Sequence, residues 1–113
     1  MSTISTHVLD TAAGRPAAGV GVTLERVDAH ETLALGVGVT DADGRVRDLL
    51  AAGATLSEGT YRLRFDVGEY FARGGRDAFY PEVVVSFRVA AGEEHYHVPL
   101  LLSPFGYSTY RGS

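Results

Sequence analysis

The chain has 113 residues, with ten basic side chains, fourteen acidic side chains and no cysteine. This length fits one domain with a single hydrophobic core, which we place at residues 1–113. The formal net charge of −4 argues against nucleic acid or an anionic membrane as a partner, and the lack of cysteine excludes disulfides, thiolate catalysis and sulfur-bound metals.

No targeting or membrane-spanning segment is recognisable in the sequence. The first six residues, MSTIST, lack the basic start and apolar stretch of a secretion signal. No apolar run approaches the roughly 18 residues that read as a membrane span, and the C-terminus is not a Ser-Lys-Leu peroxisomal signal. We therefore expect a cytoplasmic protein.

Short strands separated by turn residues are expected through the first half of the chain. The expected strands lie at residues 4–9, 20–27, 32–40 and 45–49. Gly14-Arg15-Pro16 is expected to form a turn after the first strand. The segment Asp41-Ala42-Asp43-Gly44 is a strong turn signal, with Gly44 suited to a positive φ.

The second half of the chain repeats this pattern around one short helix. Further strands are expected at residues 61–67, 83–89, 95–102 and 106–110, with a helix at residues 68–73. Gly74-Gly75 is expected to end the helix. Seven or eight short strands and one small helix predict an all-β protein, built as a sandwich or a barrel.

Strand alternation predicts where the histidines point. In the first strand Ile4 and Val8 are the better core candidates, so His7, on the opposite face, is expected to point away from the core. In residues 95–102 the residues at even positions form an apolar face, and His95 and His97 share the other face. His30 lies in an expected turn and is interpreted as a surface residue.

Three segments resemble one known family. The C-terminal sequence HYHVPLLLSPFGYSTYRGS resembles that of the 5-hydroxyisourate hydrolases, transthyretin-like enzymes of urate breakdown whose hallmark is a terminal Tyr-Arg-Gly-Ser. The segment STHVLD around His7 resembles their N-terminal signature, and TDADGR resembles their T-x-x-D-G-R segment. The resemblance covers nearly the whole chain and implies a transthyretin-like two-sheet β-sandwich with one short helix.

The resemblance also implies roles for individual residues. It assigns catalysis to His7, His97 and Ser113, and contact with the substrate to His7, Arg45, Tyr110 and Arg111. Arg47 shares a strand face with Arg45 and is the main rival for its role, while His95 shares a face with His97. No cofactor is expected, and two outward histidines without a clear third ligand make only a weak case for zinc.

The implied reaction opens one ring of an oxidised purine by adding water to a cyclic amide. Histidine suits the activation of water because its ordinary pKa is near 6.5, and an arginine offers a planar fork of donors to ring carbonyls or to an oxyanion. Which histidine takes the proton stays open. Ser113 could orient a water or a histidine, and Gly112 is expected to let the tail turn sharply where a side chain would obstruct it.

The resemblance implies a homotetramer with its sites in the channel between two dimers, since a site on one open sheet face would not surround a small ring. The main alternative is a carrier with the same fold that binds a small aromatic ligand such as a thyroid hormone. His7, which is lysine in vertebrate carriers, and the Tyr-Arg-Gly-Ser ending favour the hydrolase. A third alternative is a general binding module with a β-sandwich fold.

Overall fold

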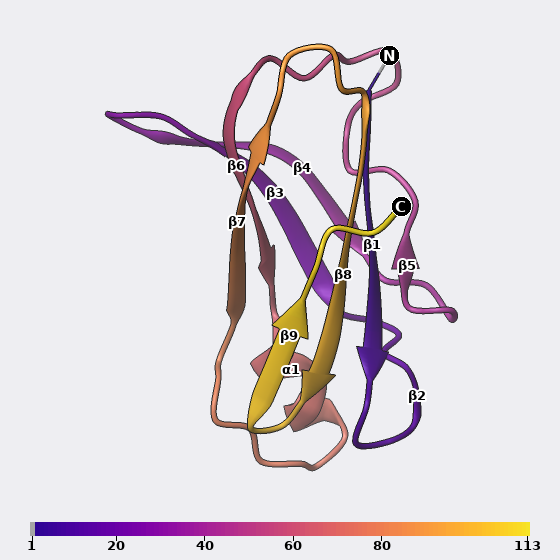
Figure 1. Cartoon of the computed structure of the whole chain (residues 1–113). Helices are drawn as coiled ribbons and strands as arrows, with labels where there is room; N and C mark the ends of the chain where they lie inside the picture. The colour runs from indigo at the N-terminus through magenta and orange to yellow at the C-terminus, as the bar shows by residue number, and fades with distance from the viewer. Residues whose placement is uncertain (1) are drawn as a thin grey trace.

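The structure is a computed structural model that describes residues 2–113, and its strands form two sheets packed face to face (Figure 1). The first sheet has the strand order β2-β1-β8-β9, with β5 also paired to β1, and the second has the order β4-β3-β6-β7. The element bounds are β1 (Thr3–Asp10), β2 (Arg15–Pro16), β3 (Gly21–Val27), β4 (Thr32–Val39), β5 (Arg45–Val46), β6 (Gly59–Phe65), α1 (Val67–Arg73), β7 (Val83–Val89), β8 (His95–Ser103) and β9 (Gly106–Thr109). The expected all-β two-sheet sandwich is confirmed.

The core lies between the two sheets and follows the predicted strand alternation. Ile4 and Val8 of β1 are fully buried, and so are Leu63 and Phe65 of β6. Burying a large apolar side chain of this kind stabilises the fold by roughly 1.5–3 kcal/mol. The remaining large, fully buried side chains are Tyr61, Phe71, Leu24, Leu100, Leu102, Val20, Val22 and Val67.

Several strand ends differ by one or two residues from the sequence-based expectation, and three differences concern β2, α1 and β5. The expected turn at Arg15-Pro16 is a two-residue strand, β2, paired with the end of β1, which raises the count to nine strands in the described residues. Helix α1 begins one residue early, at Val67, and ends before Gly74 as expected. Strand β5 ends at Val46, because beyond it the chain bends and the Leu49 amide donates to the Ile4 carbonyl at 2.9 Å.

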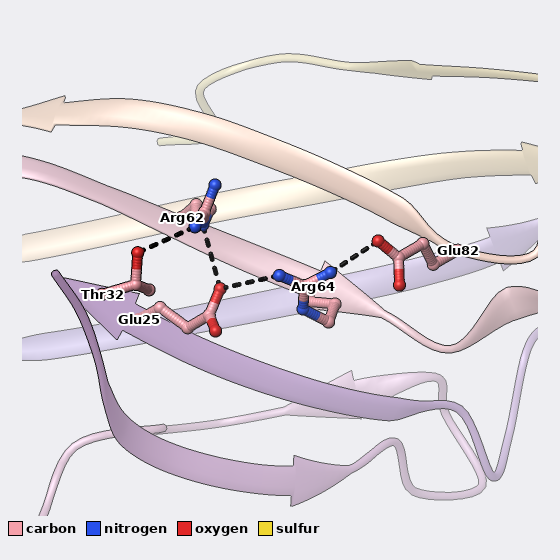
Figure 2. A network of polar contacts seen from close by, with 5 residues as sticks. All are labelled: Glu25, Thr32, Arg62, Arg64 and Glu82. Carbon is pink, nitrogen blue, oxygen red and sulfur yellow. Dashed lines mark hydrogen bonds and ion pairs between the residues drawn. The ribbon is translucent and has the colours of Figure 1, made fainter. Parts of the chain in front are cut away.

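The outer face of the second sheet carries a network of polar contacts (Figure 2). The Glu25 carboxylate accepts from Arg62 Nε at 3.0 Å and from Arg64 Nη2 at 3.3 Å. Arg64 also donates to Glu82 at 2.5 Å, and Arg62 donates to the Thr32 hydroxyl at 2.9 Å. Arg62 and Arg64 therefore have protein partners, and the network is structural.

A buried carboxylate ties the end of β1 to the segment around α1. Asp10 is fully buried, and its carboxylate accepts hydrogen bonds from Arg76 at 2.5 Å, Tyr70 at 2.7 Å and the Ala13 amide at 2.9 Å. Burial alone would raise the pKa of Asp10, but the bonds from Arg76, Ala13 and Tyr70 outweigh it and lower the pKa. Because the folded-state pKa is lowered, this contribution to stability is present at neutral pH and is lost in acid.

We expect Asp10→Ala to lower the free energy of unfolding near neutral pH by about 2–4 kcal/mol, since the change leaves Arg76 and Tyr70 without their acceptor. Urea unfolding of both proteins measures this. Asp77→Ala, which removes an exposed carboxylate, is the control. The difference from the wild type should shrink as the pH falls below the ordinary aspartate value of 3.8; equal losses in the two variants would contradict the prediction.

Candidate active site

The outer face of the first sheet places the histidines beside hydroxyl groups. Strands β1 and β8 are parallel, with Thr3 opposite His95 and Ser5 opposite His97. The Ser5 hydroxyl lies 2.8 Å from Nδ1 of His97, and the Thr3 hydroxyl lies 2.7 Å from Nδ1 of His95. Tyr96 and Val98 point the other way, into the core. The predicted outward orientation of the histidines in β8 is confirmed.

The imidazole of His97 is partly buried, and its surroundings favour the neutral form. Burial lowers the pKa of His97 from the ordinary value of 6.5, and the positive charges of Arg45 and His7 lower it further, while a backbone hydrogen bond at Ser5 opposes them. His97 is therefore an imidazole that is unprotonated at neutral pH and able to accept a proton.

His7 lies on the same outer face as His97, on the neighbouring strand. Its Cα pairs with Pro99 of β8 on one side and with Arg45 of β5 on the other. Nε2 of His7 lies 2.9 Å from the backbone carbonyl of Asp43. A carbonyl only accepts, so Nε2 carries a proton and donates it, which fixes one edge of the ring.

The turn before β5 positions Arg45. The Asp41 side chain accepts hydrogen bonds from the amides of Asp43 at 2.9 Å and Arg45 at 3.0 Å. Gly44 has a φ of 77°, as its place in the turn predicted, and a side chain there would meet the carbonyl of Val8. The turn is thus held against β1, and Arg45 emerges next to His7.

Neither the Arg45 nor the Arg47 guanidinium makes a hydrogen bond or an ion pair with a protein group of residues 2–113. This contrasts with the paired arginines on the outer face of the other sheet. Arg45 is half-buried and Arg47 is exposed. Both guanidinium groups keep their donors available for a ligand.

The C-terminal tail crosses over β8 towards β1 and ends near β5 (Figure 1). The Gly112 amide donates to the carbonyl of His97 at 2.8 Å. Gly112 does not have a positive φ, and glycine is needed here because a side chain would obstruct the tail, as expected. A Cβ at this position would lie 2.5 Å from Cδ2 of His97, and glycine therefore allows the close approach of the tail to the imidazole.

Strands β1, β5 and β8 and the C-terminal tail line an open cleft with a volume of about 330 Å³. Three of the predicted site residues line it together: Arg45, His97 and Ser113. The rivals His95 and Arg47 line it as well, so the cleft alone does not separate them from the predicted residues. The positive charge of Arg45 lowers the pKa of His97, and this favours Arg45 over Arg47 as the arginine that acts with His97.

Two predicted residues lie away from this cleft within the same chain. Tyr110 and Arg111 line a separate, mostly apolar opening of about 310 Å³ at the edges of β7 and β9. Arg111 donates to Glu93 at 3.1 Å, and its guanidinium lies 4.8 Å from the centre of the Tyr96 ring. His7 does not line the cleft, but its electrostatic interaction with His97 contributes to the lowered pKa of His97.

Within residues 2–113 we find no group of three or more His, Cys, Asp or Glu side chains that could hold a metal ion. The same part of the chain contains no helix long and apolar enough to span a bilayer.

Comparison with known proteins decides the family. The family model described as HIUase/Transthyretin matches residues 4–112. The chain belongs to this family. A 5-hydroxyisourate hydrolase of Caulobacter vibrioides is 50% identical to it over 100% of both chains. One from Halalkalibacterium halodurans is 49% identical over 97% of each.

Solved structures of family members confirm the transthyretin-like fold. The Klebsiella pneumoniae 5-hydroxyisourate hydrolase superposes with a TM-score of 0.87, at 42% identity and with all of both chains covered. Sea bream transthyretin, solved in complex with thyroxine, has a TM-score of 0.89 at 31% identity, covering 97% of this chain and 94% of that one. Proteins with this fold therefore include both an enzyme and a protein that binds thyroxine, so the function must be argued from the site.

Proposed function

We propose that residues 1–113 form a single-domain 5-hydroxyisourate hydrolase, which opens a ring of 5-hydroxyisourate to give 2-oxo-4-hydroxy-4-carboxy-5-ureidoimidazoline. The observation that carries the proposal is a partly buried imidazole, His97, held in a cleft with Ser113 and with the guanidinium of Arg45, which has no hydrogen-bond or ion-pair partner among residues 2–113. Hydrolases with 42–50% identity along the whole chain support the substrate.

The lowered pKa of His97 supports it as the general base. The imidazole takes a proton from water as the water oxygen bonds to the carbonyl carbon of the cyclic amide. The carbon–nitrogen bond of the ring then breaks, and the proton passes to the departing nitrogen. A base positioned in this way contributes about 10²–10⁴-fold to the rate.

Arg45 supplies the positive charge that the reaction needs. Its guanidinium has no partner to release among residues 2–113 and offers a planar pair of donors to the ring carbonyls or to the developing oxyanion. The protonated Nε2 of His7, held by the Asp43 carbonyl, keeps the other ring nitrogen of His7 available to the substrate. Ser113 lines the same cleft and brings its hydroxyl to it.

We infer a homotetramer with the sites in the channel between dimers. The outer face of the first sheet is open, and a second copy placed across it would turn the cleft into an enclosed site. Strands β7 and β9 each lie at one edge of their sheet, and such an edge suits pairing with another chain. In such an assembly Tyr110 and Arg111 reach substrate only if they serve the site of a neighbouring subunit. A cytoplasmic location stays a prediction.

Turnover and ligand binding separate the hydrolase from the carrier. The hydrolase accelerates the loss of 5-hydroxyisourate in proportion to the protein added. A carrier would leave that decay unchanged and would show saturable binding of thyroxine by titration calorimetry. Thyroxine binding together with absent turnover would overturn the proposal.

Arg45→Lys is expected to raise KM for 5-hydroxyisourate about tenfold or more, because an ammonium group cannot reproduce the paired donors of the guanidinium. Initial rates over a range of substrate concentrations measure this, and Arg47→Lys is the matched control from the same cleft. Arg45→Gln should also move the acid limb of kcat/KM to higher pH, since the charge that lowers the pKa of His97 is gone. An equal rise in KM for Arg47→Lys would contradict the assignment.

A further inference from the structure

We infer that Ser5 is a positioning residue for His97: its hydroxyl accepts from Nδ1–H and so leaves the lone pair of Nε2 directed to the cleft. The effect on turnover rests on the proposed function, but the contact between the Ser5 hydroxyl and His97 is seen in the structure. Ser5 comes from β1 and His97 from β8, and the parallel register places them directly opposite each other.

The contact is short, and a backbone hydrogen bond at Ser5 acts on the same imidazole. Ser5 Oγ lies 2.8 Å from Nδ1 of His97, and among residues 2–113 the Ser5 hydroxyl has no second hydrogen-bond partner. Nε2 of His97 likewise has no partner in that part of the chain, although the residue lines the cleft. One ring nitrogen is therefore engaged by the protein, and the other is left for a water or the substrate.

The opposite edge of the ring is held by the tail. Cδ2 of His97 would lie 2.5 Å from a Cβ on Gly112, so the tail backbone passes close to that edge. A half-turn of the ring would exchange Nδ1 and Cδ2. Cδ2 would then face Ser5 without a hydrogen bond, and Nδ1 would face the tail. Ser5 therefore selects one of two ring orientations of similar shape.

The hydroxyl also suits both protonation states of the base. When His97 is neutral, Nδ1 donates to Ser5 and Nε2 accepts. When Nε2 takes a proton from water, Nδ1 still donates, and the bond to Ser5 strengthens because the donor is now charged. The same contact thus fixes the starting tautomer and stabilises the imidazolium that forms.

A matched control lies two residues earlier in each of the same two strands. Thr3 and His95 make the equivalent contact at 2.7 Å, which shows that a threonine hydroxyl forms this bond in the same register. His95 is exposed, whereas His97 is half-buried. Ser5→Thr should therefore keep the function of Ser5, and Thr3→Ala should not imitate its loss.

The test combines kinetics with the tautomer of His97 in the full-length protein. We expect Ser5→Ala to lower kcat for 5-hydroxyisourate roughly tenfold, by the loss of one hydrogen bond to a group that becomes charged, with KM little changed. Ser5→Thr should recover most of kcat, and Thr3→Ala should match the wild type. In ¹⁵N spectra near neutral pH, wild-type His97 should be protonated at Nδ1, and Ser5→Ala should show both tautomers.

An unchanged kcat in Ser5→Ala, an equal loss in Thr3→Ala, or wild-type His97 protonated at Nε2 would each overturn the inference. A protein without any hydrolase activity would overturn the proposed function instead. In that case the ¹⁵N spectra would still decide whether Ser5 holds the ring.

Discussion

His97→Ala is expected to lower kcat/KM for 5-hydroxyisourate by about 10²–10⁴-fold, because it removes the imidazole that takes the proton from water. The protein should stay folded, since this side chain lies on the outer face of the first sheet and not in the core. Initial rates measure the loss of activity, and circular dichroism checks the fold.

The other three histidines are compared with His97. His30→Ala changes an exposed residue far from the cleft and should leave the rate unchanged. His7→Ala should lower the rate, whereas His95→Ala should have a smaller effect than either His7→Ala or His97→Ala. If His95→Ala proves as damaging as His97→Ala, the strand alternation and the sequence signature have selected the wrong imidazole.

Removal of Arg111 to Ser113 is expected to abolish most of the activity while leaving a folded protein. The deletion takes away the hydrogen bond from Gly112 to His97, the groups that Ser113 brings to the cleft, and the ion pair of Arg111 with Glu93. It removes no residue of the core between the sheets, although the core residue Tyr96 loses its contact with the Arg111 guanidinium. Turnover and the urea midpoint of the truncated protein measure the two effects separately.

A single substitution in the tail tests the same idea with less disturbance. Gly112→Ala places a methyl group against the His97 ring and should lower turnover more than stability. Gly106→Ala is the matched control in β9, since its Cβ would meet only Ser103 Oγ, at 3.7 Å. Full activity in the truncated protein would contradict the role of the tail.

The faces of the strands could be predicted from the sequence because alternation is a local property. The burial of Ile4 and Val8 in β1 and the outward orientation of His7 and His97 followed from period two alone. The turn before Arg45 followed from local chemistry too, since Asp41 and Gly44 favour it in any fold.

The contacts between distant segments could not be predicted in this way. The pairing of Ser5 with His97 joins residues 92 positions apart, and no local pattern sets the register of two parallel strands. Strand β2 forms only because the end of β1 lies beside it. The position of Tyr110 and Arg111 away from the cleft depends on the path of the tail, which its sequence does not specify.

The most direct test of the proposed function is an ultraviolet time course of 5-hydroxyisourate, prepared freshly from urate with urate oxidase. The spontaneous decay is subtracted, and the wild-type protein is compared with His97→Ala. We predict decay that accelerates in proportion to the wild-type protein and stays near the spontaneous rate with the variant. No acceleration by the folded wild-type protein would contradict the assignment as a 5-hydroxyisourate hydrolase.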